Sequence, residues 1–417
     1  MTKHEALSKY FGYTTFRPAQ ELIIDAILSG RDVVGVMPTG AGKSICFQIP
    51  ALLLSGITLV ISPLISLMKD QVAQLRQGEI PAAFINSSLS AGQCQEVLRR
   101  VRDSRYKIIY IAPERLETAS FLQFALEATI SFIAVDEAHC ISQWGQDFRP
   151  SYLKISEFIE KLKKRPVIGA FTATATTDVK KDIIRLLKLH DQFNLTTGFD
   201  RPNLFFGIEK PKNKAKHFYE MIEERSGKSG VVYCATRRSV DKIYAELRRR
   251  GVSTARYHAG LEDLERRVNQ DAFIQNNITV MIATNAFGMG IDKPDVRYVI
   301  HYNMPKNLES YYQEAGRAGR DGKPSDCILL FSDRDIKTAE HLIKDSGQNK
   351  EHTDKERRKV LMHDVRRLDK MIRYCEIDSC LRSYILGYFG EKHKGNCGKC
   401  SNCLKPSIWQ KLFGRHV

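Results

Sequence analysis

Short, apolar, β-rich runs recur along this chain, and each is followed by a polar or amphipathic stretch of helical length. Strands that alternate with helices in this way form βαβ units, whose strands run parallel in one sheet. Up to about residue 195 the pattern therefore predicts a mainly parallel α/β fold. The predicted strands of this part are 32–38, 57–63, 82–86, 107–113, 132–137 and 167–174.

The alternation stops near residue 200 and then restarts. Residues 198–214 contain two prolines and a cluster of charges, which is typical of a linker. A second α/β unit of about 130 residues is predicted to follow. Beyond about residue 335 the chain is highly charged and helical in character, and it leads into a group of cysteines. The predicted strands of the second unit are 230–236, 253–258, 279–284, 296–302 and 327–331.

The charge balance favours a polyanionic partner. Lysine and arginine outnumber aspartate and glutamate by 64 to 48, which gives a formal net charge of +16. Nucleic acid comes first as such a partner and an anionic membrane surface second, while a generally basic, solvated surface is the plainer alternative. We see neither an apolar run long enough for a membrane span nor a secretory signal, so we expect a location in the bacterial cytosol, associated with the nucleoid.

Residues 37–44, MPTGAGKS, stand between a predicted strand and a predicted helix. Small residues there let backbone N–H groups approach phosphate oxygens, and the following helix adds a favourable dipole. Lys43 would meet the β- and γ-phosphates of ATP, and the Ser44 hydroxyl would bind Mg²⁺. The alternative is an ordinary glycine-rich turn, but GKS at this junction favours a nucleotide site. The predicted phosphate loop comprises Thr39, Gly40, Ala41, Gly42, Lys43 and Ser44.

An acidic pair follows the predicted strand at 132–135. Asp136 would hold Mg²⁺ directly or through water, and Glu137 would position and activate the attacking water. Alone, such a pair is more often a solvated loop. Downstream of a phosphate loop in the same sheet, it predicts the catalytic acids of an ATPase.

Residues 311–322, YYQEAGRAGRDG, supply Gln313, Arg317 and Arg320. The two arginines lie three residues apart, on one helical face if the segment is helical. A solvated basic turn is the plain alternative. The sharper hypothesis is an arginine finger that the second α/β unit donates across a cleft to stabilise the transferring phosphoryl group.

Together these segments resemble a known family. The phosphate loop, DEAH at 136–139, FTATAT at 171–176, residues 283–305 and QEAGRAGRDG at 313–322 resemble the superfamily 2 helicase motor. FRPAQ at 16–20, the run 139–152 and the terminal cysteines narrow the resemblance to RecQ-type DNA helicases. It covers about residues 10–405, with the motifs in family order. The resemblance implies two RecA-like parallel-sheet motor lobes and a small helical zinc-binding module, with bounds of 1–200, 201–338 and 339–406, and a tail at 407–417.

By the same resemblance, the chain selects and senses ATP with residues outside the phosphate loop. A glutamine amide can pair with the N6/N7 edge of adenine, so Gln20 is expected to select ATP over GTP, supported by Arg17. Asp292 is expected to face the nucleotide from the second lobe, near Arg320.

The run HCISQWGQDFRPSY at 139–152 places scarce large aromatics in a polar segment directly after the acidic pair. Trp144 and Phe148 offer faces on which bases can stack, and Arg149 can bind phosphate or stack. His139 and Gln143 are expected to relay the state of the nucleotide. The alternative is that the two rings anchor the loop on its own domain.

Segments after other predicted strands look like the family's contacts to single-stranded DNA, and they include Thr236 and Thr284. Small hydroxyls and backbone amides suit phosphates because they bind position rather than sequence. The alternative for each segment is a strand-end cap or turn. The other segments of this kind are 62–72, 86–88 and 112–116.

Five of the ten cysteines cluster between residues 375 and 403. Four thiolates suit structural Zn²⁺, and CxxC spacing is a strong signal for it. Cys397, Cys400 and Cys403 have this spacing, and Cys380 is chosen over Cys375 because it resembles the family's first ligand. His393 is a possible substitute ligand, and a redox role is the alternative.

The resemblance implies an ATP-dependent 3′-to-5′ helicase on single-stranded and partly duplex DNA, with ATP, Mg²⁺ and Zn²⁺, in repair and recombination. Longer members of the family carry a winged helix after the zinc module, whose absence here would weaken unwinding. The tail could dock on a protein partner. The alternatives are an RNA-directed helicase or a translocase that does not unwind, a zinc-dependent binding protein with a decayed motor, and a metabolic phosphate-loop kinase.

Overall fold

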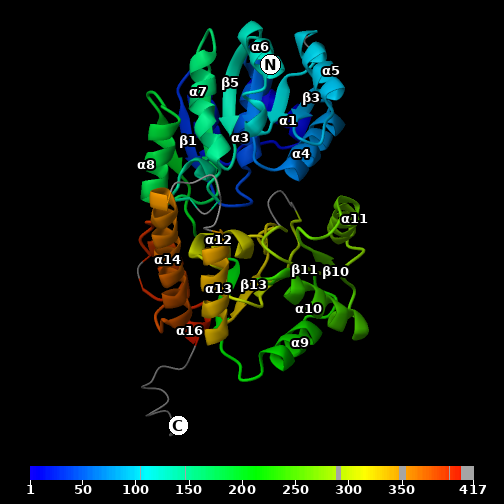
Figure 1. Ribbon diagram of the computed structural model, residues 1–417, viewed down its shortest axis with the longest axis vertical. Coiled ribbons are helices and arrows are strands. Elements are labelled where there is room, and N and C mark those ends of the chain that lie inside the picture. Colours follow the sequence, from blue (N-terminus) through cyan, green and yellow to red (C-terminus); the bar gives the residue numbers. More distant parts are fainter. Residues whose placement is uncertain (104, 146, 288–292, 347–353, 394, 405–417) are drawn as a thin grey trace. The chain divides into compact units, whose positions relative to one another are not determined.

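The computed structural model describes the chain except for residues 104, 146, 288–292, 347–353, 394 and 405–417 (Figure 1). It divides into two compact units, Met1–Gly198 and Phe199–Val417. Each unit is built on its own parallel sheet, as the alternation of short strands and helices predicts. The predicted α/β class with two parallel-sheet lobes is confirmed.

The described strands of the first unit form a seven-stranded parallel sheet in the order β3-β4-β2-β5-β6-β1-β7. Six of them correspond to the six predicted runs, and their continuous apolar character reflects burial on both faces of the sheet. The strands are β1 Val33–Val36, β2 Ile57–Ile61, β3 Ala82–Ile85, β4 Ile108–Ile111, β5 Ile130–Val135, β6 Val167–Thr172 and β7 Phe193–Thr196.

Strand β7 was not predicted. It pairs with β1 at the edge of the sheet, in the register Val33 opposite Phe193. Its four residues are half-buried or exposed in alternation, so they lack the continuous apolar run that marks the central strands.

Helices connect the strands of the first unit, and local capping fixes where several of them begin. Thr2 and Glu5 form a capping box at the first helix, and Ser90 and Gln93 form another at the fifth. The helices are α1 Lys3–Phe11, α2 Pro18–Leu28, α3 Lys43–Leu53, α4 Ile65–Gln77, α5 Ala91–Arg102, α6 Ala119–Glu127, α7 Lys154–Lys161 and α8 Thr177–Leu186, with 3₁₀ turns η1 Pro113–Arg115, η2 Ala138–Ile141 and η3 Pro150–Leu153.

The described strands of the second unit form a six-stranded parallel sheet in the order β10-β11-β9-β12-β13-β8. The predicted linker at 198–214 was wrong in part, because Leu204–Glu209 is strand β8 and pairs with β13 along its length. The two prolines flank this apolar strand and do not interrupt it, so no ladder hydrogen bond is lost. The other strands are β9 Gly230–Tyr233, β10 Thr254–Tyr257, β11 Val280–Ala283, β12 Tyr298–His301 and β13 Ser325–Leu330.

The helical C-terminal region packs on this second sheet. Helix α14 lies against α12 and α13, and Tyr374 of α14 hydrogen bonds to Tyr311 of α12 at 3.3 Å (Figure 1). A β-bridge joins Phe206 of β8 to Cys400. The helices of this unit are α9 Lys214–Glu224, α10 Arg237–Arg249, α11 Asp263–Ile274, α12 Leu308–Ala315, α13 Asp333–Ser346, α14 Asp354–Glu376, α15 Leu381–Tyr388 and α16 Ser401–Leu404.

Within the described part of the chain, every helix is too short or too polar to cross a bilayer. The parallel arrangement has a direct consequence for function. All strands of one sheet end at the same edge, so polar residues that follow different strands can meet there.

Candidate active site

The predicted phosphate loop joins β1 to α3, which begins at Lys43. Gly40 and Gly42 adopt left-handed backbone conformations with φ of 84° and 80°. A Cβ atom on Gly42 would lie 2.3 Å from Nε2 of Gln20, so no larger residue fits without movement. A tight loop at a helix N-terminus with these glycines is suited to bind phosphate.

Arg17 and Gln20 lie against this loop, although they are more than 20 residues upstream. Arg17 Nη1 donates to the carbonyl of Gly40 at 2.7 Å. Gln20 Nε2 donates to the carbonyls of Ala41 at 3.3 Å and Gly42 at 3.1 Å, and Gln20 is buried. The two residues therefore adjoin the place where a bound nucleotide would sit.

The acidic pair lies close to Lys43. Asp136 follows β5 at the same sheet edge, and burial raises the pKa of its carboxyl to about 7, with a further rise from Glu137 and an opposing effect of Lys43. Lys43 Nζ donates to the Met37 carbonyl at 3.4 Å. Lys43 and Ser44 are the first two residues of α3 and are half-buried. A buried acid with a raised pKa beside a lysine is a functional-site signature.

A buried histidine joins the acidic pair to the next strand. His139 Nδ1 lies 2.9 Å from the Thr172 hydroxyl at the end of β6 and 3.3 Å from a Glu137 carboxylate oxygen. Burial opposes the charged imidazole, but the Cys140 thiol and Glu137 raise the pKa of His139 to about 10. The Thr172 hydroxyl in turn donates to the Thr174 carbonyl at 3.1 Å. The residues of DEAH and FTATAT thus form one buried polar cluster.

The segment that follows is tied to unit 1 by several polar contacts. The Ser142 hydroxyl donates to Asp182 of α8 at 2.7 Å and accepts from the backbone N–H of Trp144 at 3.1 Å. The Tyr152 hydroxyl donates to the backbone carbonyl of Asp136 at 2.9 Å. Both ends of the segment are therefore fixed, one beside α8 and the other beside Asp136.

Between these anchors the predicted base-stacking residues reach the surface. Trp144 is 40% exposed, Phe148 is half-buried and Gln143 is exposed. Arg149 binds the Asp147 carboxylate through Nε and Nη2 at 3.1 and 3.0 Å, and its Nη1 donates to the Pro63 carbonyl at 2.9 Å. Arg149 thus links this segment to the one after β2.

In the second unit, α12 carries Gln313 but ends at Ala315. Arg317 and Arg320 lie in the turns that follow. The segment that carries them is not helical, so they do not share one face of a helix. Arg317 is buried beside the Tyr233 hydroxyl, where burial raises the pKa of Tyr233 and the charge of Arg317 opposes the rise.

The other predicted residues of the second unit follow strands. Thr236 caps α10, because its hydroxyl oxygen accepts from the Ser239 N–H at 3.1 Å, and Thr284 follows β11. Asp292 lies outside the described residues. Near Thr236 is a cavity of about 150 Å³, and its polar lining was not predicted because these residues converge only in the folded sheet. That lining includes Asn285, His301, Asn303, Lys306, Ser310 and Glu314.

The four chosen cysteines meet at one point. The Sγ atoms of Cys380, Cys397, Cys400 and Cys403 all lie within 4.8 Å of one another, as tetrahedral Zn²⁺ requires. Backbone N–H groups of Ser383 and Lys399 donate to Cys380 and Cys397 at 3.5 and 3.3 Å. Although burial raises it, hydrogen bonds from Ser383 and Cys397 lower the pKa of Cys380 to about 6. This donor set fits zinc.

The remaining ligand alternatives lie outside that cluster. Cys375 is buried on α14, where burial strongly raises the pKa of its thiol. The ring of His393 contacts the Ser383 hydroxyl at 2.9 Å. Among the described residues, the group that could hold a metal is the four-cysteine set.

Sequence reasoning missed several residues that build these sites. Tyr152, Thr172 and Asp182 hold the DEAH segment, and Arg201 and Asn203 hold the turns with the two arginines. The quoted motifs contain Tyr152 and Thr172. Their partners could not be inferred, because they depend on which strands are neighbours.

Comparison with known families divides the chain in the same order. Residues 17–182 match the DEAD/DEAH box helicase family, 213–322 the helicase conserved C-terminal domain and 333–404 the RecQ zinc-binding family. The last match, together with the cysteine cluster, shows that a zinc-binding module is present.

Individual relatives give the same result. The chain is 47% identical to the ATP-dependent DNA helicase RecQ of Bacillus subtilis over 95% of its own length and 66% of that protein. It is 37% identical to the probable ATP-dependent DNA helicase RecS of the same organism, over 97% of this chain and 92% of RecS. The chain thus spans about two thirds of the length of the RecQ relative.

Among solved structures, S. cerevisiae Dbp5 bound to RNA and ADP BeF3 matches 87% of this chain and 97% of its own, with a TM-score of 0.65 and 17% identity. At that identity the likeness shows the fold alone, that of a two-lobed RecA-like helicase.

Proposed function

Because this chain belongs to the RecQ family of helicases, we propose that it is an ATP-dependent DNA helicase that moves 3′ to 5′ on single-stranded DNA and unwinds duplex. One observation carries the proposal above the others. Lys43 of the phosphate loop lies beside the buried Asp136 and the half-buried Glu137, and His139 joins this acidic pair to Thr172. This is the arrangement that phosphate-loop ATPases use to hold a nucleotide and to cleave it.

Each predicted site residue of the first unit has a role in this proposal. Lys43 binds the β- and γ-phosphates, while backbone N–H groups of residues 39–44 cradle them. Gln20 reads the adenine edge with support from Arg17. Glu137 orients and deprotonates the attacking water.

Ser44 and Asp136 would hold Mg²⁺. The Asp136 carboxyl suits such a cation site. Burial and Glu137 raise its pKa, and a divalent cation would supply the positive charge that favours its ionised form. When bound, Mg²⁺ neutralises charge that develops on the phosphates.

In the second unit, Arg317 and Arg320 are proposed to stabilise the transferring phosphoryl group when the lobes close on ATP, assisted by Gln313 and Asp292. An arginine in that role contributes about 10³–10⁵ in rate in other enzymes. Hydrolysis would then depend on closure, and closure could be coupled to DNA.

DNA contact is proposed for the exposed part of the DEAH segment and for strand ends of the second unit. Trp144 and Phe148 would stack on bases and Arg149 would contact phosphate, while His139 and Gln143 link that contact to the nucleotide. Thr236 and Thr284 would bind the backbone. The net charge of +16 supports binding to single-stranded and partly duplex DNA.

The four-cysteine site is proposed to hold Zn²⁺ as a structural ion, since a closed set of four thiolates leaves no position for a substrate. We further propose the division into lobes at 1–200 and 201–338 and a zinc module at 339–406. We also propose that the protein acts in repair and recombination, in the bacterial cytosol beside the nucleoid. Protein partners are proposed to bind the tail 407–417.

The test is ATP hydrolysis by the purified chain without nucleic acid, with single-stranded DNA and with RNA of matched length. Stimulation by DNA alone supports the proposal, and stimulation by RNA alone would replace it with an RNA-directed helicase. A strand-separation assay then distinguishes unwinding from translocation. Translocation on DNA with weak unwinding is the second candidate, and this assay separates the two.

A further inference from the structure

The turns that carry Arg317 and Arg320 are held by a third arginine. We call residues 316–325 the arginine loop. The guanidinium of Arg201 donates to three carbonyls of this loop, at 3.1, 3.0 and 2.9 Å, which are those of Gly316, Ala318 and Gly319. A planar guanidinium that spans three carbonyls defines the path of the backbone between the two catalytic arginines.

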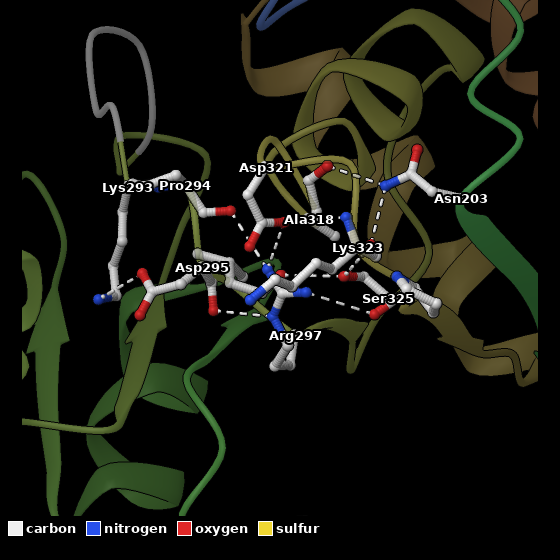
Figure 2. Close-up of polar contacts among 12 residues, drawn as sticks. Asn203, Lys293, Pro294, Asp295, Arg297, Ala318, Asp321, Lys323 and Ser325 are labelled. Carbon is white, nitrogen blue, oxygen red and sulfur yellow. Dashed lines mark hydrogen bonds and ion pairs between the residues drawn. The ribbon is translucent and has the colours of Figure 1, made fainter.

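Two further side chains fix the same loop. Asn203 Nδ2 donates to the carbonyls of Gly319 at 2.8 Å and Lys323 at 3.0 Å. Arg297 forms an ion pair with Asp321 at 2.7 Å. Figure 2 shows both side chains pointing at the loop, Asn203 from the right and Arg297 from below. The loop is thus held over most of its length.

Gly319 shows how closely these parts fit. Its φ is 56°, and a Cβ atom there would lie 2.5 Å from Nδ2 of Asn203 and 2.8 Å from the Lys323 carbonyl oxygen. The loop can approach Asn203 only because residue 319 has no side chain. Its position is therefore defined by contact and is not that of a freely solvated turn.

Arg201 is itself held by the zinc module. Arg382, the second residue of α15, is 3% exposed and follows Cys380 by two positions. Its Nη1 donates to the Arg201 carbonyl at 2.8 Å and pairs with Asp200, and its Nη2 donates to the Leu204 carbonyl. A series of contacts therefore runs from Arg382, which is two residues from a cysteine of the cluster, through Arg201 to the arginine loop.

Aromatic contacts hold the same segment between α12 and α15. Phe199 stacks on Phe389 with ring centroids 4.6 Å apart, and it accepts at its carbonyl from the Tyr312 hydroxyl at 2.5 Å. Its backbone N–H donates to Glu391 at 2.6 Å. The segment 199–204 is therefore packed on both sides, by the helix before the arginine loop and by the zinc module.

We propose that Arg201 is a positioning residue for the arginine loop, and that the zinc module holds Arg201 in place through Arg382. The inference rests on the proposed ATP hydrolysis. A catalytic group must be placed to within about 1 Å, and such a displacement can cost about 100-fold in rate. The zinc module is, on this view, part of the catalytic geometry as well as of the fold.

The experiment compares Arg201→Lys and Arg382→Lys with the full-length wild-type chain. Lysine keeps the charge but cannot span several carbonyls at once. Arg225→Lys is the matched control, because Arg225 is a half-buried arginine of the same unit that binds the Met221 carbonyl and Asp326, outside the arginine loop. Three quantities are measured: hydrogen exchange of the amides of residues 316–325, kcat and KM for ATP with single-stranded DNA, and bound zinc per chain.

We expect both variants to retain zinc, to exchange loop amides about tenfold faster and to lose about tenfold or more in kcat, with KM within about twofold. Arg225→Lys should change none of these. In a background that carries both Arg317→Ala and Arg320→Ala, Arg201→Lys should cost little more, because both groups that it positions are gone.

Unchanged loop exchange in both variants, or an additive loss of kcat in the background without Arg317 and Arg320, overturns the inference. If Arg201→Lys does not fold, Asn203→Ser removes only the amide contacts and must still speed exchange of the loop. Exchange can be measured whether or not the chain hydrolyses ATP. A wild type without DNA-stimulated hydrolysis would refute the proposed function, while faster loop exchange would still establish the contact series.

Discussion

The Nδ1 atom of His139 lies 2.9 Å from the hydroxyl oxygen of Thr172, and the same histidine lies 3.3 Å from Glu137. This contact joins the segment after β5 to the end of β6, which is the neighbouring strand in the sheet. It places a buried polar link between the residue proposed to activate water and the segment that carries the exposed Trp144.

Thr172→Val should separate these functions. Valine keeps the shape of threonine but removes the hydroxyl that contacts Nδ1 of the buried imidazole, and loss of such a buried hydrogen bond costs about 1–3 kcal/mol. We expect DNA stimulation of ATP hydrolysis to fall about fivefold or more, with basal hydrolysis within about twofold of wild type. Thr58→Val, at a buried threonine near the start of β2, is the control. An equal loss of DNA stimulation in Thr58→Val would show that the effect comes from replacing any buried threonine of the sheet and not from the contact with His139.

Lys43→Ala tests the phosphate loop. Removal of a cation that acts on the transferring phosphate should lower kcat about 100- to 1,000-fold. The melting temperature should change little, because Lys43 is half-buried and its one backbone contact is long, at 3.4 Å. Hydrolysis is measured beside Lys163→Ala, a change at an exposed lysine of the same unit. Near-normal turnover in Lys43→Ala would remove the nucleotide assignment.

Trp144→Ala tests base stacking. A stacked ring contributes about 1–3 kcal/mol per base, so affinity for single-stranded DNA should fall about fivefold or more, and DNA stimulation with it. Basal hydrolysis should be unaffected, since the ring is 40% exposed and outside the buried cluster. Tyr13→Ala, at another exposed aromatic of the same unit, should leave DNA binding unchanged. An equal loss of basal and stimulated hydrolysis would instead assign Trp144 to anchoring the loop.

The raised pKa of Asp136 predicts a pH dependence of magnesium binding. The folded carboxyl holds its proton up to about pH 7, whereas the cation needs the ionised form, so binding below pH 7 must displace a proton. Affinity for Mg²⁺ in the presence of a non-hydrolysable ATP analogue should therefore fall about tenfold between pH 8 and pH 6.

In the absence of the metal, the effect of Asp136 on stability has the opposite dependence on pH. Between about pH 4 and pH 7 the folded carboxyl is protonated and the unfolded one is not, so Asp136 makes the free energy of unfolding decrease as pH rises. Asp136→Asn should abolish both effects. A flat magnesium profile in the wild type would contradict the assigned role.

Cys397→Ser tests the zinc site. It should lower bound zinc to well below one ion per chain and lower the melting temperature, since a loss of even 2 kcal/mol corresponds to roughly 4–8 °C in a unit of this size. Cys94→Ser, at a half-buried cysteine outside the cluster, should do neither. Full zinc content with unchanged melting would show that the four thiols hold no metal.

Local signals were sufficient for much of this structure. The alternation of apolar runs predicted eleven of the thirteen described strands, and glycines beside GKS predicted the phosphate loop. The CxxC spacing alone was enough to predict that Cys397, Cys400 and Cys403 lie together, and they do. These features depend on neighbours a few residues away, so a single sequence can carry them.

The edge strands and the end of the helix before the arginines were harder to predict from the sequence. Strand β7 is half-exposed and β8 lies between two prolines, so neither shows the pattern of a central strand. The helix before the arginines ends at Ala315, where Gly316 is the C-cap residue; glycine is a helix-stop signal, and the hypothesis of one helical face did not take it into account.

The sequence by itself determined the two parallel sheets, the kinds of residues at their edges and the metal-binding thiols. Only the tertiary structure decided which of those residues meet. Thr172 reaches His139 because β6 lies next to β5, and Arg201 reaches both Arg382 and the arginine loop across more than a hundred residues of chain. Strand order and long-range packing depend on the energy of the whole fold, and no local pattern of residues encodes them.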